Sequence, residues 1–311
     1  MAQVGAGTPP RRLVIAAPRM HADELDVDVP LVRRLLAGQF PDWARMPLEP
    51  VLPRGTDHAI FRLGEGMSVR LPRRPGVELQ SALEAEWLPR LAPHVPLAIP
   101  RPLAVGEPAL GYPWRWAVHT WLPGEPAAPE RIADQCEAAL TIAAFIRALW
   151  RIDTEGAPRA ARGEPLATRD EPTRAWLATL EGVVDTELVS TLWEKALAVP
   201  VWDGPPRWVH GDLDSRNLLV SDGRFCGLLD FGCMGVGDPA CDLGVAWKLF
   251  AGEARDRFRA VLDVDDATWA RARGHVLSQS LGAISYYTAE NNPALFLAAE
   301  RWLAEVLSDR A

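Results

Sequence analysis

The chain has 311 residues, of which 48% are hydrophobic and 24% are charged. This composition is typical of a soluble globular protein, and the length suffices for two lobes with cores of their own. The formal net charge of -8 argues against nucleic acid or an anionic membrane surface as the main partner, and it suits a cationic ligand. No apolar run approaches the length of a membrane span.

The N-terminal segment differs in composition from the rest. Residues 1–20 are rich in Gly, Pro and Ala and contain three arginines but no acid. Arg11 and Arg12 precede an apolar run, an arrangement that resembles an export leader, but the run is short and ends at Pro18. We therefore expect residues 1–20 to be a disordered or non-native extension of a cytoplasmic protein. The four cysteines form no CxxC pair, which favours buried free thiols over a zinc cluster.

The first part of the chain beyond this segment predicts a small sheet. Asp28 and Pro30 are typical of a helix start, and Leu31, Leu35 and Phe40 follow at helical spacing. Apolar segments bounded by turn residues then predict antiparallel strands, with one helix among them. The expected strands cover 48–52, 59–63, 67–71, 99–107 and 112–122, and the expected helix covers 77–91.

The remainder of the chain predicts a mostly helical part. Apolar residues recur at helical spacing over 132–149, and the polar, proline-broken segment 153–172 is expected to be a surface connection. A hairpin is predicted for 217–229 around a Ser-Asp-Gly turn. Further helices are expected around 176–183 and over 188–198, 238–250, 255–262, 267–287 and 294–307.

Residues 207–243 contain the main functional signal. Asp212 stands in the sequence HGDL, Asn217 follows five residues later, and Asp230 opens the sequence DFG after the predicted hairpin. Because a hairpin returns the chain on itself, we expect the three side chains to converge at one end of it. Two carboxylates and an amide suit a hard cation such as magnesium, which prefers oxygen ligands and leaves room for nucleotide phosphates.

This order of residues matches the catalytic half of the kinase signature. Together with Asp238-Pro239 and Asp242, it resembles the aminoglycoside phosphotransferase family of small-molecule kinases. The resemblance implies an α+β, two-lobed, protein-kinase-like fold, with an antiparallel-sheet lobe over 21–121 and a mostly helical lobe over 122–311. It also implies ATP or GTP as the phosphate donor. Asp212 would be the catalytic base, and Asn217 and Asp230 would hold Mg²⁺.

The same resemblance assigns residues to the nucleotide. Arg70 stands where kinases have a phosphate-binding lysine, and Glu86, rather than Glu84, is the expected ion-pair partner on the following helix. Gly55 stands alone in the glycine-loop region. Backbone groups from His119 to Trp121 would bind the adenine.

Two further residues are expected to support the catalytic loop. The imidazole of His210 would anchor the loop backbone, and Asp242 would accept hydrogen bonds from it.

The acceptor is less well specified. Family members hold cationic acceptors with acidic side chains, and the candidates here are Glu290, Asp170 and Asp185, with Glu290 best placed. Three hypotheses remain open: an antibiotic kinase acting on an aminoglycoside or related compound, a metabolic hydroxyl kinase for an amine or sugar-amine, and a regulatory nucleotide-binding pseudokinase.

Overall fold

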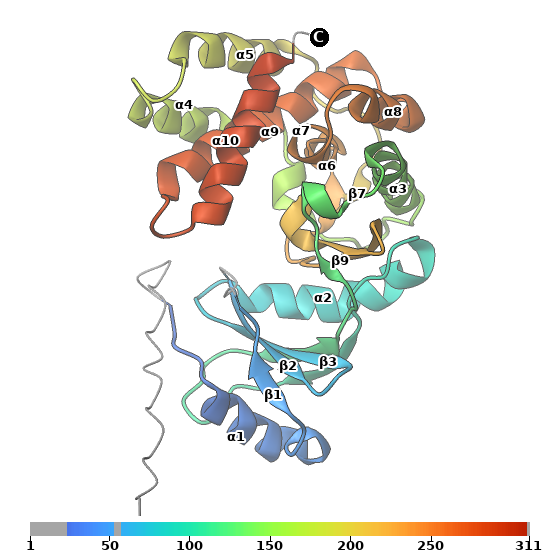
Figure 1. Ribbon diagram of the computed structural model, residues 1–311, viewed down its shortest axis with the longest axis vertical. Coiled ribbons are helices and arrows are strands. Elements are labelled where there is room, and N and C mark those ends of the chain that lie inside the picture. The colour runs from blue at the N-terminus through green and yellow to red at the C-terminus, as the bar shows by residue number, and fades with distance from the viewer. Residues whose placement is uncertain (1–23, 53–56, 310–311) are drawn as a thin grey trace, which may run out of the picture.

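The computed structural model of the protein describes residues 24–52 and 57–309. Residues 1–20 and Gly55, for which the sequence raises expectations, lie outside these ranges. The chain forms two lobes stacked along the long axis of the molecule (Figure 1). The sheet lobe and the helical lobe have separate hydrophobic clusters, as expected for a two-lobed kinase-like architecture.

The first lobe is built on an antiparallel sheet with the strand order β1-β2-β3-β5-β4. Helix α1 begins after Asp28, whose carboxylate accepts a hydrogen bond from the Leu31 backbone N–H at 2.8 Å. Leu35 and Leu36 of this helix pack on one face of the sheet, and α2 covers the other (Figure 1). The elements of this lobe are α1 (Val29–Gln39), β1 (Leu48–Pro50), β2 (His58–Leu63), β3 (Met67–Pro72), α2 (Glu78–Leu91), β4 (Pro102–Gly106) and β5 (Trp116–Thr120).

The second lobe is organised around the long helix α9, which contacts α4, α5, α6 and α10. Its helices are α3 (Gln135–Leu149), α4 (Asp170–Thr179), α5 (Thr186–Ala198), α6 (Ala240–Leu243), α7 (Val245–Leu249), α8 (Gly252–Leu262), α9 (Asp266–Tyr286) and α10 (Pro293–Ser308). Its strands are β6 (Glu125–Pro126), β8 (Leu218–Ser221) and β9 (Arg224–Leu228) in one sheet, and β7 (Arg207–Val209) and β10 (Gly235–Gly237) in another.

Helix α2 belongs to the sheet lobe and packs against the helical lobe. Trp87 on this helix lies against Trp208 of β7, with ring centroids 4.9 Å apart. Leu88 and Leu91 belong to the hydrophobic core of the helical lobe. After α2, the carbonyl of Ala98 accepts a hydrogen bond from Leu228 N–H at 2.9 Å. The position of α2 is therefore fixed against β7 and β9, the strands that precede Asp212 and Asp230.

The segment 153–172 is more than the surface connection predicted from its sequence. It contains two short 3₁₀ helices, Ala161–Gly163 and Leu166–Arg169. The backbone N–H of Ala160 donates to the carbonyl of Val236 in β10 at 3.1 Å, and Ala160 is buried. The prediction was wrong because the segment pairs with a strand edge that local composition does not reveal.

Within the described part of the chain, none of the helices has both the length and the apolar character needed to cross a membrane.

A buried histidine in α9 makes stability depend on pH. Both ring nitrogens of His275 lack a hydrogen-bond partner among the described residues. Burial, followed by the charges of Arg169, Arg271 and Lys248, lowers its pKa to about 3. The unfolded chain binds a proton near pH 6.5 and the folded chain does not, so stability is full above pH 6.5 and falls as the pH is lowered towards 3.

We therefore predict that His275→Leu reduces the loss of stability on acidification. Between pH 6.5 and 4.5, the contribution of His275 is roughly 1.4 kcal/mol per pH unit. Urea unfolding at both pH values measures it, with the exposed His94→Leu as the control. An equal pH dependence in wild type and His275→Leu would contradict the prediction.

Candidate active site

The β8–β9 hairpin brings the three predicted catalytic and metal-binding residues together. Leu218 pairs with Leu228, and the Leu229 N–H donates to the carbonyl of Asn217 at 2.7 Å. Asn217 donates from Nδ2 to the Asp212 backbone carbonyl at 2.9 Å. Asp212 and Asp230 both line a cleft of about 410 Å³ between the lobes. The residues that the spacing grouped are therefore neighbours in space.

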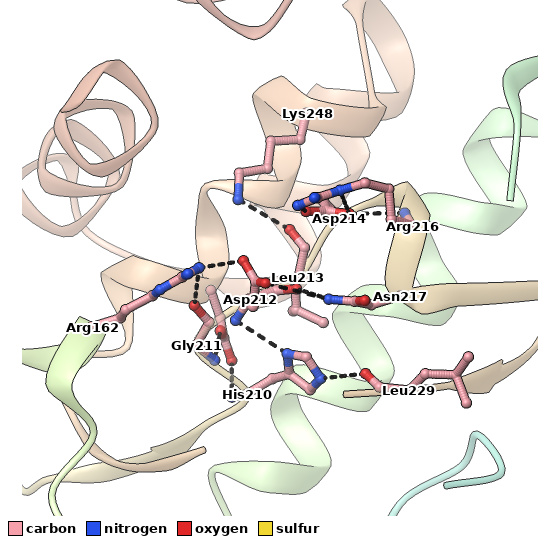
Figure 2. A network of polar contacts seen from close by, with 11 residues as sticks. Arg162, His210, Gly211, Asp212, Leu213, Asp214, Arg216, Asn217, Leu229 and Lys248 are labelled. Atoms are coloured by element: carbon pink, nitrogen blue, oxygen red, sulfur yellow. Dashed lines mark hydrogen bonds and ion pairs between the residues drawn. The ribbon is translucent and has the colours of Figure 1, made fainter. Parts of the chain in front are cut away.

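The catalytic loop is held by a buried carboxylate. Asp242 accepts hydrogen bonds from the backbone N–H groups of His210 and Gly211, at 2.7 and 2.8 Å. The His210 ring accepts at Nδ1 from the Asp212 N–H at 3.1 Å, and its Nε2 bonds the Leu229 carbonyl at 2.9 Å (Figure 2). Asp242 and His210 thus occupy the supporting positions expected for them.

Glycine is required within this loop. Gly211 has a φ of 82°, in the left-handed region, and a Cβ there would meet the Cys233 carbonyl oxygen at 2.6 Å. A larger residue would therefore separate the loop from the segment that follows DFG. Asp230 also has a positive φ, 61°, which turns its side chain into the cleft at a cost in backbone strain.

Asp212 is surrounded by cations. Figure 2 shows its carboxylate between Arg162, with which it forms an ion pair, and Asn217, while Lys248 extends over the Leu213 carbonyl. Burial favours the neutral acid, but Arg162 foremost, and then Lys248 and Arg216, hold the pKa of Asp212 below its usual value. The group is therefore ionised at neutral pH and can accept a hydrogen bond from a hydroxyl.

The ion pair on the nucleotide side differs from the prediction. Arg70 bonds both carboxylate oxygens of Glu84 at 2.9 Å, and its Nη2 lies 3.7 Å from Asp230. Although burial opposes its charge, Glu84 and then Asp230 raise the pKa of Arg70. Glu86, the expected partner, is exposed and faces Arg90 at 3.6 Å. The assignment to Glu86 was wrong because the buried face of α2 runs through Glu84, Leu88 and Leu91.

The residues expected at the adenine lie at the lobe connection. The His119 side chain is fully buried, and neither of its ring nitrogens has a partner within the described ranges. The N–H groups of Thr120 and Trp121 already donate to the carbonyls of Arg101 and Gly66, at 2.9 and 2.8 Å. Adenine binding by this stretch remains a prediction, which now rests on the other backbone groups.

The three acidic residues expected to bind the acceptor are absent from the cleft lining. Asp170 accepts from Arg174 at 2.7 Å and from Trp193 at 2.8 Å, between α4 and α5. Asp185 caps α5 through the Leu188 N–H at 3.0 Å. Glu290 is exposed in the turn before α10. In the structure these carboxylates serve helix packing and helix capping or lie at the surface, and acceptor binding by them stays a prediction.

Sequence reasoning missed Arg162, Arg169 and Lys248 on the helical side of the cleft, and Arg74 on the sheet side. Arg162 and Arg169 come from the segment read as a plain connection, and Lys248 comes from α7. No local motif marks them, because they meet Asp212 through the tertiary fold. For Lys248 the sequence offers one weak indication, because it is one of only two lysines in the chain.

The donor atoms at the hairpin end fit a magnesium ion. Nδ2 of Asn217 is engaged, which leaves its Oδ1 as an acceptor, and the Asp230 carboxylate is half exposed towards the cleft. Among the residues described, no three His, Cys, Asp or Glu side chains gather as a metal site. Magnesium does not need such a cage, because it retains waters and binds donor phosphates.

We predict that Glu84 and Glu86 differ sharply on mutation. Glu84→Ala leaves the buried Arg70 without its main partner and should lower the free energy of unfolding by about 3 kcal/mol. Glu86→Ala, the matched control on the same helix, should change it by less than about 0.5 kcal/mol. Urea unfolding measures both, and equal effects would refute the assignment.

The comparisons with known proteins agree with this geometry. The model of the phosphotransferase enzyme family matches residues 50–275. The search of curated proteins gives no match. Among solved structures, the fold is similar to a GDP complex of aminoglycoside 2'-phosphotransferase-IIIa, with a TM-score of 0.71, 17% identity and coverage of 89% of this chain and 97% of that one.

Two other solved structures are similar over most of their length. A streptomycin-ATP ternary complex of APH(2")-IIa has a TM-score of 0.59 and 19% identity, with 84% of this chain and 91% of that chain covered. The macrolide 2'-phosphotransferase of Brachybacterium faecium has a TM-score of 0.60 and 23% identity, with 91% and 99% covered. The resemblance inferred from the motifs is confirmed. The chain therefore belongs to the phosphotransferase enzyme family and has a two-lobed, protein-kinase-like fold.

Proposed function

We propose that this protein transfers the terminal phosphate of ATP or GTP to a hydroxyl group of a small molecule. The observation that carries the proposal is the meeting of Asp212 and Asp230 at one cleft, with Asn217 bonded to the first and Arg70 beside the second. Similar structures contain GDP or ATP, which supports a nucleoside triphosphate donor.

Each side chain has a distinct task in this proposal. Asp212 orients the acceptor hydroxyl and takes its proton as the phosphate is transferred. Arg70, held by Glu84, binds the donor phosphates from the sheet lobe. Asn217 and Asp230 would hold Mg²⁺, which would supply positive charge to neutralise the phosphates. Phosphoryl transfer depends mainly on such positioning and charge, which these rigidly supported groups supply.

Arg162 has two tasks in the proposed reaction. Through its ion pair it keeps the Asp212 carboxylate in place, and it also donates to the Gly211 carbonyl at 3.2 Å. Because it reaches the cleft beside the base, its remaining N–H groups can approach the transferring phosphate. The regulatory pseudokinase is the weaker hypothesis, because Asp212, Asn217 and Asp230 are all present and supported.

The chemical class of the acceptor is supported by fewer observations than the transfer of phosphate. The similar structures are of aminoglycoside and macrolide phosphotransferases, which favours an antibiotic, and a metabolic amine or sugar-amine alcohol is the alternative. Either cationic acceptor would need acidic side chains at the cleft, and Asp170, Asp185 and Glu290 do not lie there. A screen of phosphate transfer from ATP and GTP to aminoglycosides, macrolides and small alcohols tests the acceptor directly.

We predict that Asp212→Asn folds normally and loses magnesium-dependent phosphotransfer by about 10²- to 10⁴-fold, the range for removal of a general base. ATP hydrolysis, with water as the acceptor, measures this loss before the acceptor is known. Asp222→Asn, in the exposed turn of the same hairpin, is the control. Hydrolysis at the wild-type rate in Asp212→Asn would remove Asp212 from the role of base.

A further inference from the structure

The helical lobe gives the cleft an aromatic wall. Trp176 on α4, Tyr286 on α9 and Trp302 on α10 line the cleft together with Asp212. Helices α4 and α10 both pack against α9, so the three lie next to one another in the helical lobe (Figure 1). Gly282 permits this arrangement, since a Cβ there would meet the Trp176 ring at 3.0 Å. The wall offers flat apolar surfaces to the body of an acceptor.

On the side of the helical lobe, the cleft contains more cationic than anionic side chains. Each carboxylate that lines the cleft already faces an arginine: Asp57 faces Arg74 at 2.8 Å, Asp230 faces Arg70 at 3.7 Å, and Asp212 is paired with Arg162. Arg216 is paired with the buried Asp214 at 2.5 Å. Arg169 and Lys248 also line the cleft, and neither has a carboxylate oxygen within 4.0 Å in the described ranges.

Arg169 is oriented but not neutralised. Its Nε donates to the Ser278 hydroxyl at 2.9 Å, and that hydroxyl is bonded to Thr173 at 2.7 Å. This chain of hydrogen bonds fixes the guanidinium through one edge. Within the described part of the chain, its two Nη groups have no hydrogen-bond partner, so they can bind an anion.

Lys248 is held by a neighbouring aromatic ring and a backbone carbonyl. Its ammonium lies 4.9 Å from the centroid of the Trp302 ring and donates to the Leu213 carbonyl at 3.4 Å. Burial lowers the pKa of Lys248, and Asp214 and Asp212 only partly oppose this. Burial and the neighbouring Arg162 likewise lower the pKa of Arg169. A negative charge brought to this wall would therefore be stabilised, whereas a polycation would be repelled.

We propose, on the premise of the phosphotransferase function above, that the acceptor is an alcohol that carries an anionic group, such as a carboxylate, on a flat apolar body. The anion binds at Arg169 and Lys248, and the body packs against Trp176 and Trp302. Its hydroxyl then reaches Asp212. The alternative use of the two cations is to bind the terminal phosphate of the donor, and the experiment includes this outcome.

Three aromatic alcohols of similar size and different charge test the proposal. They are 3-(hydroxymethyl)benzoate, the neutral 3-(hydroxymethyl)benzamide and the cationic 3-(hydroxymethyl)benzylamine. Their affinities are measured by ligand-detected NMR with Mg²⁺ and ADP present, and kanamycin serves as a polycationic probe. We expect the acid to bind about tenfold more tightly than the amide, the gain typical of one charge-assisted hydrogen bond. The amine and kanamycin should bind more weakly than the amide.

Two variants and a control locate the site. Arg169→Gln and Lys248→Met should each reduce the acid-to-amide affinity ratio towards one, with thermal melts to verify folding. Arg174→Gln is the control, because this exposed arginine pairs with Asp170 and Glu194 outside the cleft, and it should retain the ratio. Affinity for a non-hydrolysable ATP analogue is measured in parallel.

Several results would overturn the proposal. These are equal affinities, tighter binding of the amine or kanamycin, no binding of any probe, or variants that lose the ATP analogue while keeping the acid preference. Magnesium-dependent ATP hydrolysis separates this proposal from the proposed function. Hydrolysis without acid preference contradicts only the acceptor class. Acid preference without hydrolysis contradicts the phosphotransfer and leaves an anion-binding site at Arg169 and Lys248.

Discussion

The position of the catalytic centre depends on the hydrogen bonds around His210. One ring nitrogen bonds the backbone of Asp212, and the other bonds the carbonyl of Leu229, the residue before Asp230. A single imidazole therefore sets the distance between the two functional carboxylates. Asp242, buried in the helical lobe, fixes this histidine through its backbone N–H. Because unsatisfied buried groups are costly, the whole set is retained or lost together.

The second constraint is electrostatic, and it differs on the two sides of the cleft. On the sheet side, one guanidinium, Arg70, faces both Glu84 and Asp230, so one negative charge is left over there before any ligand binds. On the helical side, Arg169 and Lys248 add positive charge beyond the paired arginines. The two sides of the cleft therefore differ in charge, and the proposed anionic acceptor rests on this difference.

The sequence predicts those parts of the candidate site whose residues lie close together in the chain. Asp212, Asn217 and Asp230 could be found because a short hairpin controls their distance. Glu84 could also have been found, because its spacing to Leu88 and Leu91 places it on the buried face of α2, whereas Glu86 lies on the exposed face. Arg162, Arg169 and Lys248 could not be found, because only the tertiary fold brings them to the cleft. The tertiary fold likewise places Asp170, Asp185 and Glu290 outside the cleft lining, which local sequence does not reveal.

The central claim is that Asp230 and Asn217 form one metal and nucleotide site opposite Asp212. Calorimetric titration of a non-hydrolysable ATP analogue, with and without magnesium, tests it most directly in wild type, Asp230→Asn and Asn217→Ala. We predict that magnesium increases affinity about tenfold or more in wild type and has little effect in either variant. A magnesium effect of equal size in all three proteins would contradict the claim.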